Sequence, residues 1–185
     1  GADVDFAIID SKSSLCVYTT RPDTLFGVTF MVLAPEHPLV DALIATPPED
    51  CDGDALEAYA TTAKNRADVD RMADAKGKSG VFSGLYATNP ATGDAIPIWI
   101  ADYVLMGYGH GAIMAVPAHD ARDNAFAKAH DIPIVEVVQP REEEITDGCF
   151  SGSGTAINSS SEHLSIDGLQ TIEAQKKTIT WLKEN

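Results

Sequence analysis

The sequence predicts one domain of mixed β and α structure, in which a closed or nearly closed β-barrel carries helices on its surface. At 185 residues the chain is long enough to bury one sizeable core, and its 44% of hydrophobic residues excludes a wholly disordered chain. Short runs rich in β-branched and aromatic residues alternate with turn-forming residues, which predicts strands. Segments with apolar residues at helical spacing lie between these runs and predict helices.

Seven segments have the composition of strands and are bounded by turn-forming residues. They are residues 6–9, 15–20, 30–34, 81–88, 96–106, 112–116 and 134–138. Residues 89–94 contain Asn, Pro, Gly and Asp and predict a hairpin loop between two of these strands. Apolar residues on both faces of the strand that begins at Ile96 place it centrally in the sheet, and Pro97 predicts a strand end or a bulge there.

Four segments carry apolar residues at the spacing of one helical face. They are residues 36–44, 54–73, 120–130 and 171–184. Residues 139–162 contain a charged run followed by glycines and serines, which predicts a mobile surface connection and not a second domain. The whole chain, residues 1–185, is therefore expected to form a single domain.

Charge and cysteine content narrow the classes of function. Thirteen basic residues against 28 acidic ones give a net charge of −15, whereas proteins that bind nucleic acid through counterion release are usually basic. A chain of this charge that meets RNA is expected to contact only a small piece of it. The three cysteines lie far apart without a CxxC pair, which fits a reducing compartment. No membrane span and no secretory leader are evident, so we expect a cytoplasmic or organellar protein.

Most standard catalytic motifs are absent from the sequence. There is no GxSxG elbow, no HExxH and no Walker A sequence. Residues 107–111 are rich in glycine, but Met114 takes the place of the third glycine in a dinucleotide fingerprint, and the segment leads into a strand. His119 and Asp120 could bind a metal, but His110 is nine residues away and no third spaced ligand is evident. We therefore expect neither a cofactor nor a metal.

Two polar segments stand out, and the first is Thr19-Thr20-Arg21-Pro22-Asp23-Thr24. It clusters three threonines and an arginine where a predicted strand ends, and Pro-Asp favours a turn. One interpretation is purely structural, with Asp23 or Thr24 capping a short helical turn. The other is functional, with hydroxyl groups forming a polar rim around a small ligand.

The second segment is residues 111–123, in which an apolar strand leads into Ala118-His119-Asp120 and then a helix. Asp120-x-x-Asp123 has the spacing of a helix cap, with Asp123 in the first turn, where the helix dipole favours a carboxylate. The functional alternative is that a carboxylate at this helix start binds a cation, such as the ammonium group of a substrate.

Together these segments resemble the editing domain of leucyl-tRNA synthetase, an insertion often called connective peptide 1. The resemblance spans essentially the whole chain and is carried by residues 19–24, 30–38 and 101–123. Two ordered motifs about 80 residues apart are more specific than either alone. Valyl- and isoleucyl-tRNA synthetases carry related insertions, but Met114-Ala115-Val116-Pro117 and Arg122-Asp123 favour the leucyl family. Nothing resembles the HIGH or KMSKS signatures of a synthetic site, so the chain looks like a domain excised from a larger synthetase.

The resemblance implies post-transfer editing, in which tRNA-Leu carrying isoleucine, norvaline or methionine is hydrolysed and leucyl-tRNA is spared. It implies that Asp123 binds the α-ammonium group and that Thr24 narrows the side-chain pocket against leucine. Thr19 and Thr20 would line the ester, and together with Asp123 they are the expected catalytic residues. No residue presents itself as a covalent nucleophile, so we expect a positioned water to attack the ester carbonyl.

The resemblance also implies a substrate-binding set around the terminal adenosine. Arg21 would lie beside the ribose, while Met114, Tyr108 and His119 would shape the pocket, with Arg122 nearby. The implied partners are the 3′-terminal aminoacyl-adenosine of mischarged tRNA-Leu and the remainder of the synthetase, with no membrane.

Other readings of the same residues stay open at this point. The chain could be a binding module for aminoacyl-adenosine that turns nothing over, a valyl-type editing domain, a free-standing trans-editing factor, or a structural insertion. The net charge of −15 argues against a free-standing factor, which would need its own tRNA-binding surface. His110 departs from the threonine that the bacterial family commonly carries, and its effect stays undecided.

Overall fold

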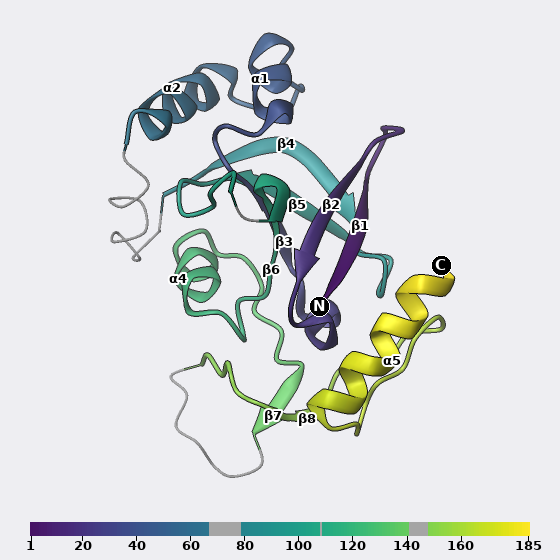
Figure 1. Ribbon diagram of the computed structural model, residues 1–185. Helices are drawn as coiled ribbons and strands as arrows, with labels where there is room; N and C mark the ends of the chain where they lie inside the picture. The colour runs from purple at the N-terminus through teal and green to yellow at the C-terminus, as the bar shows by residue number, and fades with distance from the viewer. Residues whose placement is uncertain (67–78, 108, 141–147) are drawn as a thin grey trace.

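The computed structural model describes residues 1–66, 79–107, 109–140 and 148–185. Figure 1 shows a strand-rich body with helices at its two ends and along one side. The strands are β1 (Ala2–Ile8), β2 (Ser14–Thr19), β3 (Phe30–Leu33), β4 (Val81–Thr88), β5 (Ala95–Ile100), β6 (Ala112–Ala115), β7 (Val138–Pro140) and β8 (Gly154–Ala156). The α-helices are α1 (Pro38–Ala45), α2 (Gly53–Lys64), α4 (Ala121–Ala129) and α5 (Thr171–Glu184), and the 3-10 helices are η1 (Pro22–Gly27) and η2 (Gly109–Gly111).

Six strands form one mixed sheet in the order β2-β1-β4-β5-β3-β6. The pair β3 and β5 is parallel, and the other neighbours are antiparallel. The two edge strands, β2 and β6, lie beside each other without a hydrogen-bonded ladder between them among the described residues. The sheet therefore curls into a nearly closed barrel, which confirms the predicted fold class.

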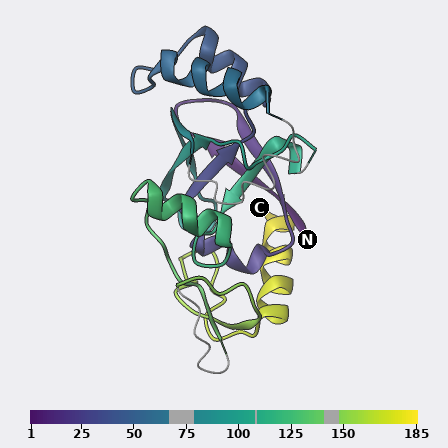
Figure 2. The same cartoon turned by 90° about the vertical axis from the view of Figure 1, so that its left-hand side faces the viewer.

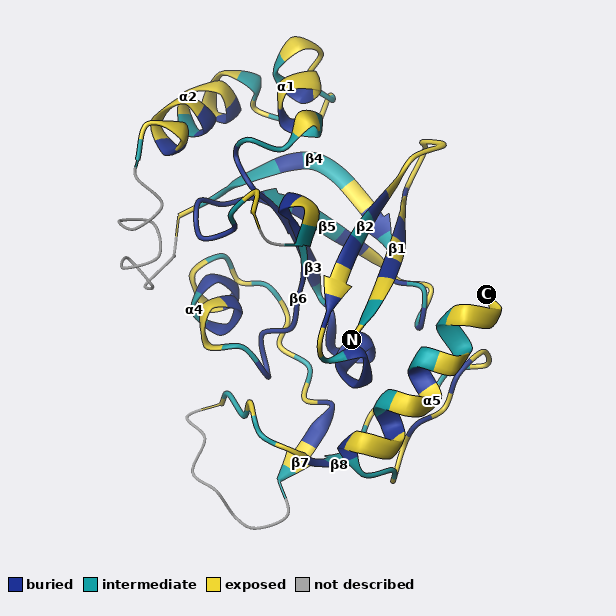
Figure 3. Cartoon of the chain, viewed as in Figure 1, coloured by how far each residue is buried: buried dark blue, intermediate teal, exposed yellow. Residues whose placement is uncertain are grey.

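Buried side chains pack on both the inner and the outer face of the barrel sheet. Alternate residues of β1 and β2 point into the main core, whereas all four residues of β3 are buried, because both of its faces are covered (Figure 3). A second cluster covers the outer face of β3 with residues of α4, where the rings of Phe30 and Phe126 stack with centroids 5.3 Å apart. Helices α1 and α2 lie at one end of the barrel, and α5 lies at the other, as Figures 1 and 2 both show.

The predicted hairpin and bulge between β4 and β5 are both confirmed. The Asn89 amide donates to the Asp94 carbonyl across the loop, and the buried Asn89 side chain donates to the Leu25 carbonyl of η1. The register of β4 against β5 shifts just before the pair of Tyr86 with Pro97. Gly84 lies in that irregular stretch at φ 78°, a backbone conformation that strains residues with a Cβ.

The helix predictions agree with the structure to within a few residues where it describes them. Residues 171–184 are α5, residues 120–130 contain α4, and residues 36–44 overlap α1. The predicted helix 54–73 corresponds to α2, which ends at Lys64, while residues 67–73 lie outside the described residues.

Two strand predictions are wrong over most or part of their length. Residues 101–106 follow β5 as turns, because the Asp102 carboxylate pairs with Arg66 and the Tyr103 hydroxyl turns to Asp123. Residues 134–137 belong to no regular element, and β7 begins only at Val138. Both segments are rich in apolar residues because they are partly buried loops, a feature that local composition does not distinguish from a strand.

The described part of residues 139–162 contains paired structure. β7 and β8 form a two-stranded antiparallel sheet, and the loop after β8 buries Ser159. Residues 141–147 lie outside the described residues, so the mobility expected for this connection stays a prediction. α5 packs against η1, where the Gln175 amide donates to the buried Asp23 carboxylate over 3.0 Å. None of the described helices is long and apolar enough to cross a membrane.

Candidate functional site

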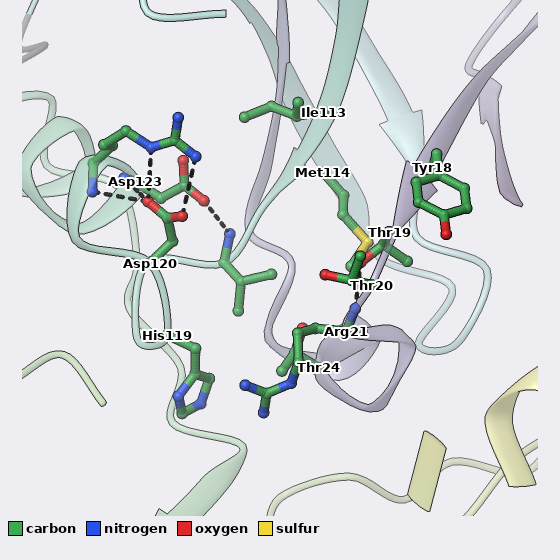
Figure 4. A pocket seen from close by; sticks show the side chains of 12 residues that line it. Tyr18, Thr19, Thr20, Arg21, Thr24, Ile113, Met114, His119, Asp120 and Asp123 are labelled. Carbon is green, nitrogen blue, oxygen red and sulfur yellow. Dashed lines mark hydrogen bonds and ion pairs between the residues drawn. The ribbon is translucent and has the colours of Figure 1, made fainter. Parts of the chain in front are cut away.

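A cavity of about 150 Å³ opens beside the seam between β2 and β6 (Figure 4). It is lined by the end of β2, the start of η1, the strand β6 and the first residues of α4. The lining residues are Tyr18, Thr19, Thr20, Arg21, Thr24, Ile113, Met114, Val116, His119, Asp120, Arg122 and Asp123. Segments about 90 residues apart in the chain thus meet at one small polar opening.

Asp123 is a buried carboxylate at one wall of this cavity, with 3% of its surface exposed. One of its oxygens accepts a hydrogen bond of 2.9 Å from the Val116 amide, and the other accepts one of 3.0 Å from the Tyr103 hydroxyl. Burial raises the pKa of Asp123 from 3.8 to about 7, and the charge of Asp120 adds to this effect. The two hydrogen bonds and the charge of Arg122 oppose the rise without cancelling it.

The raised pKa decides what Asp123 can bind. A carboxyl group with a pKa near 7 is only partly ionised at neutral pH. A cation beside it lowers this pKa and so favours the ionised form. Each carboxylate oxygen keeps a further lone pair after it has accepted its hydrogen bond from Val116 or Tyr103. The site can therefore accept a small cation such as an ammonium group, or exchange a proton with a bound ligand.

Tyr103 orients Asp123 from outside the cavity lining. It is buried, and burial followed by the charge of Asp123 raises the pKa of its hydroxyl, so that this hydroxyl stays protonated and donates. The ring also lies 6.0 Å from the Arg122 guanidinium carbon. Tyr103 was not predicted as a site residue, because it lies in a segment with the composition of a strand and no local pattern connects it to α4.

Asp120 caps α4, as its spacing predicted. Its carboxylate accepts hydrogen bonds from the backbone amides of Arg122 and Asp123, the free donors of the first helical turn. It also pairs with the half-exposed Arg122 side chain at 3.2 Å. The structural interpretation therefore holds for Asp120, while Asp123 is held by groups outside its own helix.

Arg21 and Asp23 form a rigid corner between β2 and η1. The Nε of Arg21 donates to both carboxylate oxygens of Asp23, over 3.1 and 3.2 Å, and its Nη2 donates to Oδ2 over 2.9 Å. Another Arg21 nitrogen donates to the Ser151 carbonyl. Asp23 is 1% exposed, and this pairing keeps its charge from being buried alone. Arg21 therefore borders the cavity with much of its hydrogen-bonding capacity already used.

The three threonines of the first motif differ in what their hydroxyl groups do. The Thr19 hydroxyl accepts from the Arg21 amide, and the Thr24 hydroxyl donates to the Arg21 carbonyl. Both side chains are buried, at 8% and 2% exposure. Thr20 is exposed, and its hydroxyl has no hydrogen-bond partner among the described residues. Thr20 thus offers a hydroxyl group to a ligand or a water, whereas Thr24 forms a fixed part of the wall.

His119 is fully engaged by the chain itself. Its Nε2 accepts from the amides of Val137 and Val138, so Nδ1 carries the proton and donates to the Phe150 carbonyl over 2.6 Å. Burial lowers the pKa of His119, which keeps this neutral form. The imidazole thus satisfies the two backbone amides at the start of β7, and it has no nitrogen left for a metal.

The structure brings together eight of the nine residues that the sequence analysis proposed for the site: Thr19, Thr20, Arg21, Thr24, Met114, His119, Arg122 and Asp123. The ninth, Tyr108, lies outside the described residues. Four lining residues were not among the nine: Tyr18, Ile113, Val116 and Asp120, the last of which was predicted only as a helix cap or a metal ligand. Tyr18 and Ile113 adjoin proposed residues and could have been included by proximity, whereas Val116 contributes its backbone amide and carries no side-chain signal.

Comparisons with known proteins agree on one family. The profile of the family described as leucyl-tRNA synthetase, editing domain, matches residues 1–183. The leucine–tRNA ligase of Streptomyces griseus is 48% identical over 202 residues, covering 100% of this chain and 21% of that protein. The leucine–tRNA ligase of Chlorobium chlorochromatii is 46% identical over 184 residues, covering 99% of this chain and 22% of that protein.

A solved structure is similar as well. It is described as the ternary complex of Agrobacterium radiobacter K84 agnB2 LeuRS, tRNA and LeuAMS. It matches with a TM-score of 0.63 and 33% identity, and the match covers 79% of this chain and 17% of that one. The chain thus spans about a fifth of the length of the relatives that it matches.

Proposed function

Given that the chain belongs to the family of leucyl-tRNA synthetase editing domains, we propose that it hydrolyses the ester bond of mischarged tRNA-Leu and spares leucyl-tRNA. The substrates are tRNA-Leu molecules that carry isoleucine, norvaline or methionine. A hydrophobic pocket separates side chains that differ by one methylene by only about 1 to 3 kcal/mol, so a single selection step leaves errors. A second cavity of different shape supplies the missing discrimination.

The observation that carries this proposal is the buried carboxylate of Asp123 at a small cavity that also has threonines in its lining. The α-ammonium group of an aminoacyl ester would ionise Asp123 and pair with it. That pairing anchors one end of the substrate. The side chain of the amino acid then meets the fixed wall that includes Thr24, and a leucine side chain does not fit there productively.

Among the described residues, the lining contains neither a cysteine nor a lysine, and no hydrogen bond joins its threonines to a basic side chain, so the proposed reaction is direct attack by water. Water adds to the ester carbonyl carbon, and the bond from this carbon to the ribose oxygen then breaks. The ribose oxygen takes a proton, and the products are the free amino acid and tRNA-Leu. The exposed residue Thr20 and its buried neighbour Thr19 are proposed to orient the water and the developing oxyanion.

Charge and size limit the part of the tRNA that this domain contacts. The net charge of −15 repels a polyanion, and a cavity of about 150 Å³ has room for one end group. The 3′-terminal aminoacyl-adenosine is therefore the proposed partner, while the remainder of the synthetase holds the tRNA body. Met114, Arg122 and His119 are proposed to shape the pocket around this end. Because both ring nitrogens of His119 are hydrogen-bonded to the backbone, this side chain is proposed to contact the substrate by its shape and not by hydrogen bonds.

A binding experiment separates the recognition step from turnover. Calorimetry or NMR would follow a nonhydrolysable aminoacyl-adenosine analogue that carries norvaline, and the leucine analogue would serve as the comparison. We expect the norvaline analogue to bind and Asp123→Ala to weaken it by about 30-fold or more, since removing one partner of a buried charge pair costs about 2 to 5 kcal/mol. Asp123→Asn keeps the shape of the side chain and tests whether the charge is needed. Equal binding by all three proteins would refute the ammonium site.

Hydrolysis is tested with isoleucyl-, norvalyl- and leucyl-tRNA-Leu. Thr24→Ala is expected to let leucyl-tRNA be cleaved, because the wall of the pocket recedes. Thr61→Ala, an exposed threonine of α2, is the matched control and should leave the specificity unchanged. Continued sparing of leucyl-tRNA by Thr24→Ala would remove Thr24 from the discriminating role. Binding of the analogues without any hydrolysis would instead support a non-catalytic binding module.

A further inference from the structure

A second group of chemically reactive side chains lies outside the cavity. Among the described residues, Asp3, Cys16 and His110 each offer one ligand atom, and these atoms all lie within 4.8 Å of one another. Asp3 and His110 are exposed, and Cys16 is partly exposed. None of the three lines the proposed substrate cavity.

The backbone holds two of these residues in a defined relation. In the antiparallel ladder of β1 and β2, Asp3 pairs with Tyr18 and Asp5 pairs with Cys16. Asp3, Asp5 and Cys16 therefore share the outer face of the hairpin, because side chains alternate along each strand while Val4 and Val17 are buried. Asp3 and Cys16 are diagonal neighbours across the two strands, close enough for both side chains to coordinate the same ion.

The third residue comes from the turn before β6. His110 lies in η2 with φ 62°, and Gly109 and Gly111 on either side also have positive φ. This left-handed turn packs against β2. His110 is thus carried to the hairpin by the part of the chain that faces it across the seam between β2 and β6.

The donor set has the chemistry of a zinc site. A thiolate, an imidazole and a carboxylate are the three ligand types that Zn²⁺ takes in proteins, with bonds of about 2.0 to 2.3 Å. Tetrahedral bonds of that length put neighbouring ligand atoms about 3.3 to 3.8 Å apart. The observed separations of at most 4.8 Å reach this range through small rotations of exposed side chains.

The surrounding charge favours a cation at this position. Burial and the charges of Asp5 and Asp3 raise the pKa of the Cys16 thiol. The same negative groups attract a divalent ion, which displaces the thiol proton to solvent when sulfur coordinates. Three protein ligands leave a fourth position for water.

We propose that Asp3, Cys16 and His110 bind one Zn²⁺ ion on the outer face of the barrel. The ion joins the β1–β2 hairpin to the turn that precedes β6. These elements flank the seam at which β2 and β6 lie side by side without a ladder. Because Tyr18 and Thr19 follow Cys16 along β2 and line the cavity, the metal also steadies one wall of the site. This proposal does not depend on the proposed hydrolysis.

Cobalt gives a direct readout of this coordination. The chain would be titrated with Co²⁺, whose thiolate complexes absorb by charge transfer in the near ultraviolet, and Zn²⁺ would then displace it. We expect one Co²⁺ per chain with a thiolate band that Zn²⁺ removes. Cys16→Ser should abolish the band, and His110→Asn should weaken Co²⁺ binding by about tenfold or more. Zn²⁺ should also raise the midpoint of thermal unfolding in the parent chain and not in Cys16→Ser.

Matched variants use the same residue types elsewhere in the chain. Cys149→Ser and His163→Asn alter a cysteine and an exposed histidine outside the cluster, and both should keep the full Co²⁺ signal. The absence of a thiolate band, a band that survives Cys16→Ser, or a band that Cys149→Ser removes would each overturn the proposal. Since the three ligands are exposed or partly exposed, circular dichroism of every variant should match that of the parent chain.

Discussion

Replacing Asp123 by asparagine should stabilise the chain at neutral pH, although the substitution removes the residue proposed to bind substrate. The physical reason is the cost of holding an ionised carboxylate in a buried position. Asparagine has nearly the same shape. Its oxygen can accept from the Val116 amide, and its amide group can donate to the Tyr103 hydroxyl.

The size of the effect follows from the raised pKa. A carboxyl group whose pKa rises from 3.8 to about 7 on folding costs about 4 kcal/mol once it is fully ionised, at about 1.4 kcal/mol per pH unit. The folded state holds the proton more tightly than the unfolded state, so the native protein loses stability as the pH rises from about 4 to 7. About 3 kcal/mol of this loss falls between about pH 5 and about pH 8.

The assay is urea unfolding at several pH values, followed by tryptophan fluorescence, for the parent chain and Asp123→Asn. The free energy of unfolding of the variant, relative to the parent, should increase by about 3 kcal/mol from about pH 5 to about pH 8. Asp94→Asn, an exposed acid in the 89–94 loop, is the matched control and should show no such trend. A difference between Asp123→Asn and the parent that is the same at every pH would refute the reasoning, since it would mean that Asp123 is ionised throughout.

Three further substitutions test the surroundings of the site. His119→Ala should lower the free energy of unfolding by about 2 to 4 kcal/mol, because it leaves two backbone amides and one carbonyl without their partner. Because burial lowers the His119 pKa below 6.5, acid unfolding of the parent should set in as the pH falls below that value, and His119→Ala should lack this contribution. Tyr103→Phe removes a donor that opposes the rise in the Asp123 pKa, so the pH at which analogue binding is half-maximal should move upward. Phe126→Ala should cost about 3 to 5 kcal/mol in urea unfolding, since its fully buried ring contacts that of Trp99 at 5.5 Å.

For each of the three variants, one result would contradict the role given to the residue. Unchanged stability of His119→Ala would show that the imidazole does not hold the segment that leads into β7. A pH profile of Tyr103→Phe that coincides with that of the parent would remove Tyr103 from its positioning role. A loss below about 1 kcal/mol for Phe126→Ala would mean that the second core cluster repacks around the missing ring.

Local sequence patterns determined the position of most regular elements. The helix at residues 171–184 was predictable because its apolar positions repeat with the helical period, and α4 because Asp120 supplies a cap at its start. The bulge in β4 was predictable from Pro97, which cannot donate to a ladder. The two polar motifs, together with the family resemblance that they carry, also indicated most of the residues that line the cavity.

Tertiary structure decided what local patterns could not contain. Residues 101–106 and 134–137 have the composition of strands, yet their polar groups bond to side chains brought from elsewhere, with Arg66 and Asp123 engaging the first segment. The Asp123 pKa near neutrality depends on burial, and burial is a property of the packed barrel. Likewise, Asp3, Cys16 and His110 are separated in sequence and meet only because the barrel brings its two edge strands side by side. Periodicity and capping act over a few residues, whereas desolvation and side-chain contacts between distant segments exist only after the chain has closed on itself.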